Sequence, residues 1–378
     1  MIFILALPFS WASSVFGSIY RAIAILLLLA YLLLNVGKVR LRPDNQVVRR
    51  AFTYYVLFAA ATMIWTTNRT TGYSEILGML LVLIIAYVFS SYSYDDLSNA
   101  AIDYCWIIAG AVAAIIYLRG GSANVGIYGN RTTLMILGTA TDPNEFSSIF
   151  VVSVSLMLAH IMNNKRFIIK AGFAALSLIE LYVVLMAGSR GALIGVLIAV
   201  FVTLFLTGKI SAKGMIISII ASILLLWVVT VYILPYIPND ILTRLSIKSM
   251  INDGGSGRTT IWKSGMEQWA NGNPIRWLIG YGVDGIKAHG IRGDTGTMHN
   301  QILQQIVYYG IIGLILYLRL IWVAYESIRH DNRRYLGAFL GIMFMSLTIT
   351  MGAHCKILWI IIMMAFVKPE VSDKQVIS

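Results

Sequence analysis

Long runs of apolar residues without a charged side chain constrain this chain more than any other feature of its sequence. The run from Met215 to Leu234 covers 20 residues and contains no Asp, Glu, Lys or Arg. About 20 apolar residues form a helix long enough to cross the hydrocarbon core of a bilayer. In hydrocarbon, every backbone amide must find its partner inside a helix or a closed barrel. Barrel strands alternate polar and apolar residues over about ten positions, so these runs predict membrane-spanning helices.

The composition extends this prediction to the whole chain. Hydrophobic residues make up 58% of the sequence and charged residues only 12%, whereas soluble domains carry about 25% charged residues. We therefore expect an all-α integral membrane protein in which residues 1–378 form a single polytopic domain. Apolar spans are predicted at residues 2–16, 18–36, 51–66, 76–92, 100–118, 146–161, 167–187, 191–206, 215–234, 301–328, 336–351 and 357–367. If the first segment crosses, the chain has about 12 transmembrane helices and both termini lie on the same side.

The basic residues orient these predicted spans. The net charge of +12 does not indicate nucleic-acid binding, because Lys and Arg cluster in alternate short links between apolar runs. An excess of Lys and Arg marks the cytoplasmic links of membrane proteins. The residues concerned are Lys38, Arg40, Arg42, Arg49, Arg50, Lys165, Arg166, Lys170, Lys209, Lys213, Arg329, Arg333, Arg334, Lys368 and Lys374. Both termini are therefore predicted to be cytoplasmic, although the inner link at 94–99 carries two acids and no positive charge.

The sequence predicts neither a metal nor a cofactor. Cys105 and Cys355 lie in or beside apolar runs and have no metal-like spacing, and no cluster of His, Asp and Glu has ligand spacing. A phosphate-binding loop of the P-loop type is also absent from the sequence. The run from Ile2 to Phe16 lacks a basic start and a small-residue cleavage site, so we interpret it as a short first span and not as a cleaved signal.

Two predicted external connections are long, at 119–145 and 235–299. The second is too long for a structureless loop, and apolar residues recur at helical spacing in 239–251 and 258–269. We therefore expect short helices that lie over the bundle. This loop holds seven basic residues and five acids, a positive excess that runs against the usual bias of outer loops. It indicates either an anionic ligand such as a lipid diphosphate, which Arg binds in a bidentate fork, or a solvated surface.

Arg190 and His299 stand where predicted external turns enter the next span. Arg190, in the segment LMAGSRGALIG, is expected close to a helix N-terminus, where backbone amides favour anions; the alternative is an Arg that extends to the lipid headgroups. His299 is expected at the N-terminus of the 301–328 helix, whose dipole depresses the pKa of imidazole and favours the neutral base. The alternative there is an interfacial His that caps the helix. Glu180 lies inside a predicted span, where a carboxylate either pairs with a basic residue such as Arg21 or lies on a proton path.

Four segments together resemble the bacterial O-antigen ligase/polymerase family of membrane glycosyltransferases. They are TDPNEFS at 141–147, AGSRGALIG at 187–195, GRTTIWKSG at 257–265, and His299-Asn300 followed after nine residues by Gly310-Ile-Ile-Gly313. The resemblance covers residues 140 to 313 and the topology of many spans with a large late external loop. It implies a GT-C-like helical bundle and a metal-independent, inverting glycosyl transfer from a glycan carried on undecaprenyl diphosphate.

The resemblance also implies roles for individual residues. Arg190 and Arg258 would hold the diphosphate and stabilise it as the leaving group, and His299 would orient or deprotonate the acceptor hydroxyl. Lys263 and Asn300 are further predicted substrate-binding residues. Asp142 and Asn144 are alternatively structural, as caps of the helix that begins near Phe146.

Two functions within the family and one outside it remain open. A polymerase transfers the glycan to another lipid-linked repeat unit, whereas a ligase transfers it to the lipid A core of lipopolysaccharide; we favour the polymerase. A polyprenyl-linked glycan transporter is the non-enzymatic alternative, but transporters commonly contain repeated halves and this chain has no internal repeat. We expect a multi-pass protein of the bacterial inner membrane with its active site on the periplasmic face. Its expected partners are the lipid-linked glycan, the bilayer and a chain-length regulator.

Overall fold

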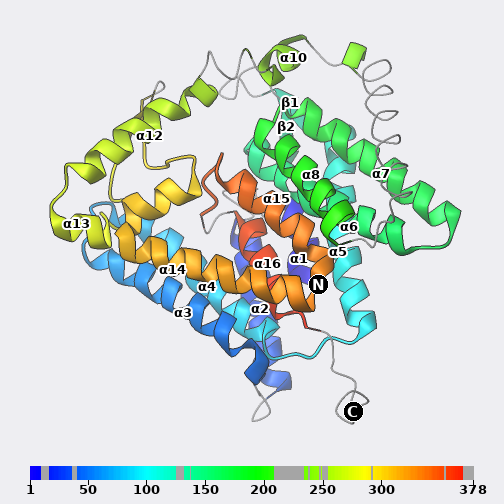
Figure 1. Cartoon of the computed structure of the whole chain (residues 1–378), viewed down its shortest axis with the longest axis horizontal. Coiled ribbons are helices and arrows are strands. Elements are labelled where there is room, and N and C mark those ends of the chain that lie inside the picture. Colours follow the sequence, from blue (N-terminus) through cyan, green and yellow to red (C-terminus); the bar gives the residue numbers. More distant parts are fainter. Residues whose placement is uncertain are drawn as a thin grey trace.

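Helices dominate the structure (Figure 1), a computed structural model that describes residues 1–9, 17–35, 41–124, 132–136, 138–207, 234–236, 239–246, 248, 254–290, 293–352 and 355–368. The helices up to the turn at 187–189 are α1 (Ile2–Leu5), α2 (Gly17–Leu34), α3 (Gln46–Ala61), α4 (Arg69–Phe89), α5 (Asp96–Leu118), α6 (Pro143–Asn163) and α7 (Phe167–Met186). The later helices are α8 (Arg190–Val202), α10 (Asn239–Leu245), α12 (Gly254–Ala270), α13 (Pro274–Ile279), α14 (Gln301–Asp331), α15 (Leu336–Ser346) and α16 (Lys356–Met363).

Within the described ranges, 6 helical segments are long and apolar enough to cross a membrane. They are Pro43–Ile64, Arg69–Phe89, Asp96–Leu118, Pro143–Asn163, Phe167–Met186 and Gln301–Asp331. Three shorter apolar helices lie at Ile25–Leu34, Arg190–Phe205 and Lys356–Phe366. The all-α membrane fold is thus confirmed, but the predicted count of about 12 spans is not supported. The predicted span at 215–234 lies outside the described residues.

The first predicted span is wrong over the part that the structure describes. The helix that begins at Ile2 ends at Leu5, and a 3-10 turn at Leu7–Phe9 follows it. Pro8 explains the stop, because proline cannot continue a helix without losing a hydrogen bond and clashing with the preceding turn. Ile4 and Leu7 are fully buried, and this short segment packs against α5. It fills the bundle and does not cross it as a helix.

The helices form two groups joined by α16. Figure 1 shows α3, α4 and α14 together in one group and α6, α7, α8 and α15 in the other, in agreement with their contacts. In the second group, α8 and α15 approach closely because Gly195 and Gly341 face each other's backbone, as small residues allow in membrane bundles. Helix α16 contacts α4, α14 and α15, and every residue from Ile357 to Met363 is buried.

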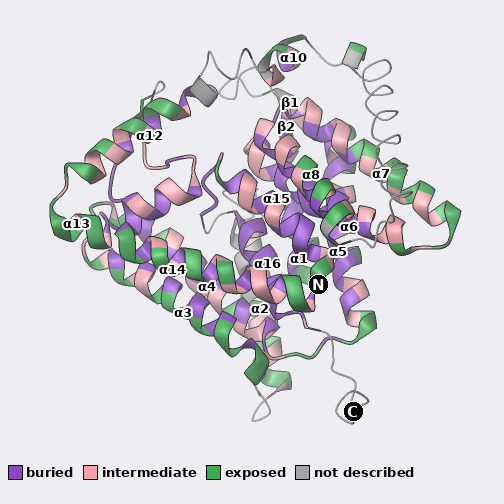
Figure 2. Cartoon of the chain, viewed as in Figure 1, coloured by how far each residue is buried: buried purple, intermediate pink, exposed green. Residues whose placement is uncertain are grey.

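Helix α7 shows most clearly which solvent the bundle needs. Its mean hydropathy is 2.0, yet only 17% of its apolar window is buried inside the protein. Figure 2 shows exposed and half-buried residues along its length, and Phe167 and Ile168 are more than four-fifths exposed, at 81% and 84%. A helix this apolar and this exposed would be strongly unfavourable in water, so lipid is the medium that fits it.

The two long connections, 119–145 and 235–299, each contain a small sheet that the sequence did not predict. In the first connection, β1 (Ser122–Asn124), β2 (Thr132–Ile136) and β3 (Thr139–Ala140) form an antiparallel sheet in the order β1-β2-β3. In the second, β4 (Ala288–Gly290) pairs with β5 (Gly293–Thr295), with His289 opposite Asp294. The predicted helices of the second connection are present as α10 and α12. Figure 1 shows α12 extending along one side of the molecule, away from α7.

A cluster of charged residues joins the first turns of α5, the last turns of α6 and the link before α15. Asp103 is 2% exposed. It forms an ion pair with Arg334, whose Nε lies 3.1 Å from one carboxylate oxygen, and it accepts a hydrogen bond from the Tyr335 hydroxyl at 2.5 Å. His160 Nε2 lies 3.4 Å from the other carboxylate oxygen, and Arg334 also donates to the Asn99 carbonyl at 3.4 Å. Asp103 of α5 is therefore paired with a basic residue from the link before α15.

Helix α14 is broken at Gly310, where the sequence predicted one continuous span. Gly310 has φ 64° and ψ −165°, which frees the carbonyls of the preceding turn. Val307 and Tyr308 accept hydrogen bonds from the backbone N–H groups of Tyr281 (3.0 Å) and Gly282 (2.8 Å) instead. Irregular backbone at membrane depth is tolerated where protein satisfies it. The glycine of the predicted Gly-x-x-Gly motif thus joins the external loop to the helix.

Replacing Gly310 by Ala should lower the stability of the fold. A left-handed backbone costs a residue with a side chain about 1–2 kcal/mol, and the added Cβ would overlap the backbone of Leu278. We expect the Tm of the purified G310A protein in detergent to drop by several degrees. The control is Gly172→Ala in α7, where nothing lies within 4 Å of the added Cβ and Tm should stay or rise slightly. Equal Tm values for both variants would contradict the broken-helix geometry.

Candidate functional site at the start of helix α14

His299 lies just before α14 in a backbone conformation that is uncommon for a residue with a side chain. Its φ is 48°, in the left-handed region that His tolerates better than most residues. The preceding Met298 is fixed from two sides, because its N–H donates to Gln304 Oε1 at 2.7 Å and its carbonyl accepts from the Trp262 indole N–H at 2.7 Å. Thr297 Oγ1 lies 3.3 Å from His299 Nε2. The imidazole is thus positioned by α14 and α12 together.

Helix α12 places Arg258 within electrostatic reach of this imidazole. Trp262 bonds to Met298, and Gly265 lies so close to the Met298 side chain that a Cβ there would overlap it. Burial lowers the pKa of His299 below its usual 6.5, the positive charge of Arg258 lowers it further, and the negative charge of Asp142 partly opposes both. The lowered pKa agrees with the prediction, but the predicted cause, the helix dipole, is not the main one. A neutral imidazole near pH 7 can accept a proton.

The Asp142 turn connects this site to the Arg190 turn. Asp142 caps α6 by accepting hydrogen bonds from the N–H groups of Asn144 (2.7 Å) and Glu145 (3.2 Å), as the structural alternative predicted. The Asn144 amide oxygen accepts a hydrogen bond from the Ser189 hydroxyl at 3.0 Å. Ser189 in turn caps α8, whose first residue is the half-buried Arg190. The Arg190 turn is therefore hydrogen-bonded to the Asp142 turn, and the charge of Asp142 acts on His299.

Asn300 and Lys263 are the other two predicted binding residues. In the structure, Asn300 caps a helix, and Lys263 points away from Arg258. The Asn300 side chain caps α14 by accepting a hydrogen bond from the Leu303 N–H at 3.1 Å. Lys263 is 78% exposed and lies 3.9 Å from Glu267. It follows Arg258 by five residues, about 140° around the helix axis at 100° per residue, so the two side chains leave α12 in different directions.

Glu180 is fully buried in the bundle and away from these turns. Its Oε1 accepts a hydrogen bond from the Ser153 hydroxyl at 2.9 Å, and its Oε2 has no hydrogen-bond partner among the described residues. The close approach of Gly110, where a Cβ would lie 2.6 Å from Oε1, makes room for the carboxyl group. The predicted pairing with Arg21 involves a side chain outside the described residues.

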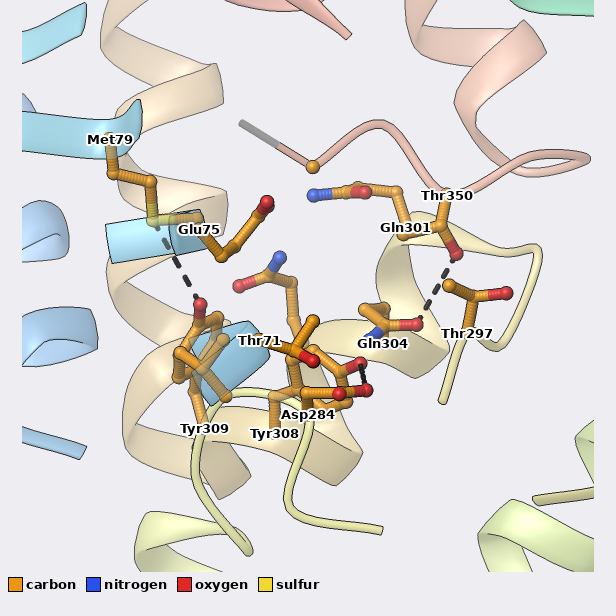
Figure 3. Close-up of a pocket in the computed structure, with 13 residues that line it drawn as sticks. Thr71, Glu75, Met79, Asp284, Thr297, Gln301, Gln304, Tyr308, Tyr309 and Thr350 are labelled. Atoms are coloured by element: carbon orange, nitrogen blue, oxygen red, sulfur yellow. Dashed lines mark hydrogen bonds between the residues drawn. The ribbon is translucent and has the colours of Figure 1, made fainter. Parts of the chain in front are cut away.

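A cavity lined by both polar and apolar side chains, which the sequence did not predict, opens beside the His299 turn (Figure 3). Thr297 and Gln301, which flank His299 and Asn300, both line it, and its volume is about 110 Å³. Opposite α14, the lining includes Glu75 from α4 and Asp284 from the loop after α13. A signal was present in the sequence, because Gln301, Gln304, Gln305 and Tyr308 follow the i, i+3, i+4, i+7 spacing of one helix face. A polar stripe on an otherwise apolar span marks a functional face.

The apolar helices and this loop-borne site define a polytopic helical membrane protein with a polar site at one end of its bundle. Residues 173–318 match the family model described as O-Antigen ligase. The matched segment runs from α7 past the break in α14, and it contains Arg190, Arg258 and His299. The match supports the predicted resemblance to the O-antigen ligase/polymerase family over this part of the chain. No curated protein matches the chain.

Proposed function

We propose that this protein is a polymerase of an O-antigen type surface polysaccharide, working at the periplasmic face of the bacterial inner membrane. In this proposal it transfers a glycan from undecaprenyl diphosphate to a lipid-linked repeat unit. Two observations support the proposal. The charges of Arg258 and Asp142 act on His299, and Asn144 of the Asp142 turn accepts a hydrogen bond from Ser189, the residue before Arg190. Fixed cations beside a neutral base suit a reaction that expels a diphosphate and removes a proton from a hydroxyl group.

The reaction we propose is a single inverting displacement. The acceptor hydroxyl oxygen attacks the anomeric carbon of the donor sugar from the face opposite the diphosphate. The new glycosidic C–O bond forms as the anomeric C–O bond to phosphorus-bound oxygen breaks, and that electron pair leaves with the diphosphate. Arg190 and Arg258 stabilise the charge on the leaving group by bidentate hydrogen bonds, and the hydroxyl proton passes to the His299 imidazole. Lys263 has no contact with the diphosphate in this scheme.

A ligase is the second candidate, because the matched family model is described as O-Antigen ligase. The two differ only in acceptor: a second lipid-linked repeat unit or the lipid A core. A chain-length regulator would be a partner of the polymerase. The half-buried arginine and the exposed apolar surface of α7 fit either substrate pair, since both donors and both acceptors are membrane-bound.

Reconstitution with one acceptor at a time tests the proposal. Purified protein in liposomes receives the lipid-diphosphate-linked repeat unit alone, and the products are separated by size. We expect a ladder of glycans and one polyprenyl diphosphate released for each bond formed. Product that appears only after lipid A core is added, as one transfer per core, would replace the polymerase by the ligase. No glycan transfer with either acceptor would refute both.

A further inference from the structure

The cavity beside His299 has the opposite charge from the arginine turns. Among the residues that line it there is no Lys or Arg, and two carboxylates, Glu75 and Asp284, face it. Burial raises the pKa of Asp284, and the charge of Glu75 raises it further, against hydrogen bonds from Tyr308, Thr71 and Asn68. The two acids are therefore electrostatic neighbours. A diphosphate would be repelled here and attracted to Arg190 and Arg258, so the cavity suits a different part of the substrates.

Three glutamines of α14 present fixed amide groups to this cavity. The protein occupies the amide oxygen of each: Gln301 accepts from the Met351 N–H at 2.8 Å, Gln304 from the Met298 N–H at 2.7 Å, and Gln305 from the Tyr55 hydroxyl at 3.0 Å. The NH2 ends of Gln301 and Gln305 then remain as donors, whereas Gln304 is also hydrogen-bonded to the Tyr308 hydroxyl. In Figure 3, the Gln301 amide and the Glu75 carboxylate point toward each other across the cavity.

Fixed amide donors on one wall and carboxylate acceptors on the other can bind a ligand that carries several neighbouring hydroxyl groups. Each hydroxyl group donates one hydrogen bond and accepts others, so a ring with several hydroxyls can satisfy both kinds of wall. The cavity is several times larger than the roughly 10–15 Å³ that one water molecule needs. Its volume of about 110 Å³ suits one sugar ring and not an oligosaccharide. Tyr308 and Tyr309 add aromatic surface to the same wall.

We propose that this cavity is the acceptor subsite, which binds one uncharged sugar ring and excludes rings that carry a carboxylate or a phosphate. The inference rests on the proposed transfer reaction and adds its acceptor chemistry. Because Thr297 and Gln301 border both the cavity and the His299 turn, a ring held here has its hydroxyl groups beside the proposed base. The diphosphate of the donor stays on the arginine side. Opposite charges on the two sides of His299 then orient the two lipid-linked substrates.

Sugar binding without any donor tests this subsite separately from catalysis. The full-length protein in nanodiscs is titrated with methyl glucoside, methyl N-acetylglucosaminide and methyl glucuronide, with saturation-transfer NMR as the readout. We expect at least one of the neutral glycosides to bind at least about tenfold more tightly than the glucuronide, since a buried carboxylate rejects a like charge. Glu75→Gln should weaken binding of the neutral glycoside and remove most of the preference for it over the glucuronide. The matched control Glu326→Gln changes a carboxylate on the far half of α14, 3.2 Å from His330, and should change neither.

A second variant guards against a folding defect in the first. Thr71 lines the cavity but is exposed, so Thr71→Phe should block the cavity. It also removes the Thr71 hydrogen bond to Asp284, which should lower the Tm only slightly because a single exposed hydrogen bond adds little net stability. Loss of glycoside binding in this variant supports the subsite. If no glycoside binds, or if the glucuronide binds as well as the neutral rings, the subsite is refuted even if reconstituted transfer succeeds. Glycoside binding in a protein that forms no product would instead refute the transfer reaction.

Discussion

Arg190→Ala should reduce glycan transfer by about a thousandfold or more, the scale expected when a charged group that stabilises the leaving group is lost. The folded protein should survive, because Arg190 is the first residue of α8 and the cap is provided by Ser189. Arg190→Lys keeps the charge but loses the planar fork, and should retain only part of the activity. The measurement is product formation in proteoliposomes at saturating lipid-linked substrate.

The same variant separates an enzyme from a transporter in cells. An enzyme without Arg190 should lose polymer while lipid-linked repeat units accumulate at the outer leaflet, whereas a defective flippase traps them at the inner leaflet. Arg119→Ala is the matched control: this Arg is exposed at the end of α5, on the same predicted external side, and its loss should leave polymer unchanged. Normal polymer in the Arg190→Ala strain would remove Arg190 from the site.

His299→Asn should lower kcat/KM by about a hundredfold or more, which is typical for the loss of a general base. Asn is the informative replacement because it tolerates the left-handed backbone that His299 adopts. The loss of activity then reports the imidazole and not a distorted turn. The control is His289→Asn, which removes an exposed imidazole that lies 2.9 Å from Asp294 and should leave the rate unchanged. Equal rates for the two variants would rule out a base at position 299.

The pH profile gives an independent check on the same residue. The active form of the proposed base is neutral, and the pKa of His299 is lowered from 6.5. Activity should therefore be level around neutral pH and fall only as the pH drops below 6.5, through the lowered value. Asp142→Asn keeps a good helix cap but removes the one charge that raises this pKa, so its acid limb should move to lower pH. A shift to higher pH, or none, would contradict the assignment.

Local sequence patterns predicted those parts of the molecule that depend on local physics. Apolar runs located α5, α6 and α7 to within a few residues, because a lipid solvent imposes one requirement on every residue of a span. The Asp142 cap could be predicted from the sequence for a similar reason, because a helix cap involves only the first turn of its own helix. The roles of Arg190, Arg258 and His299, which the motifs indicate, stay predictions.

Features that depend on contacts between residues far apart in the chain could not be predicted from local sequence patterns. The break at Gly310 requires the Tyr281 and Gly282 amides to replace lost helix partners, and no periodicity records such an exchange. The cavity requires α4 and the loop after α13 to face α14, and Glu75 alone looks like any acid near the end of a span. The pairing of Asp103 with Arg334, more than two hundred residues later in the chain, was not predictable from local sequence for the same reason.

The break in α14 also decides how the bilayer acts on the site. In an uninterrupted helix, any tilt imposed by a thicker or thinner bilayer would be passed along the axis to His299. Here the segment 301–309 is bonded to the loop after α13, while 311–331 continues into the apolar bundle. We therefore expect Gly310 to act as a flexible joint between these two parts. A change in lipid thickness would then alter the tilt of 311–331 and leave the imidazole in place.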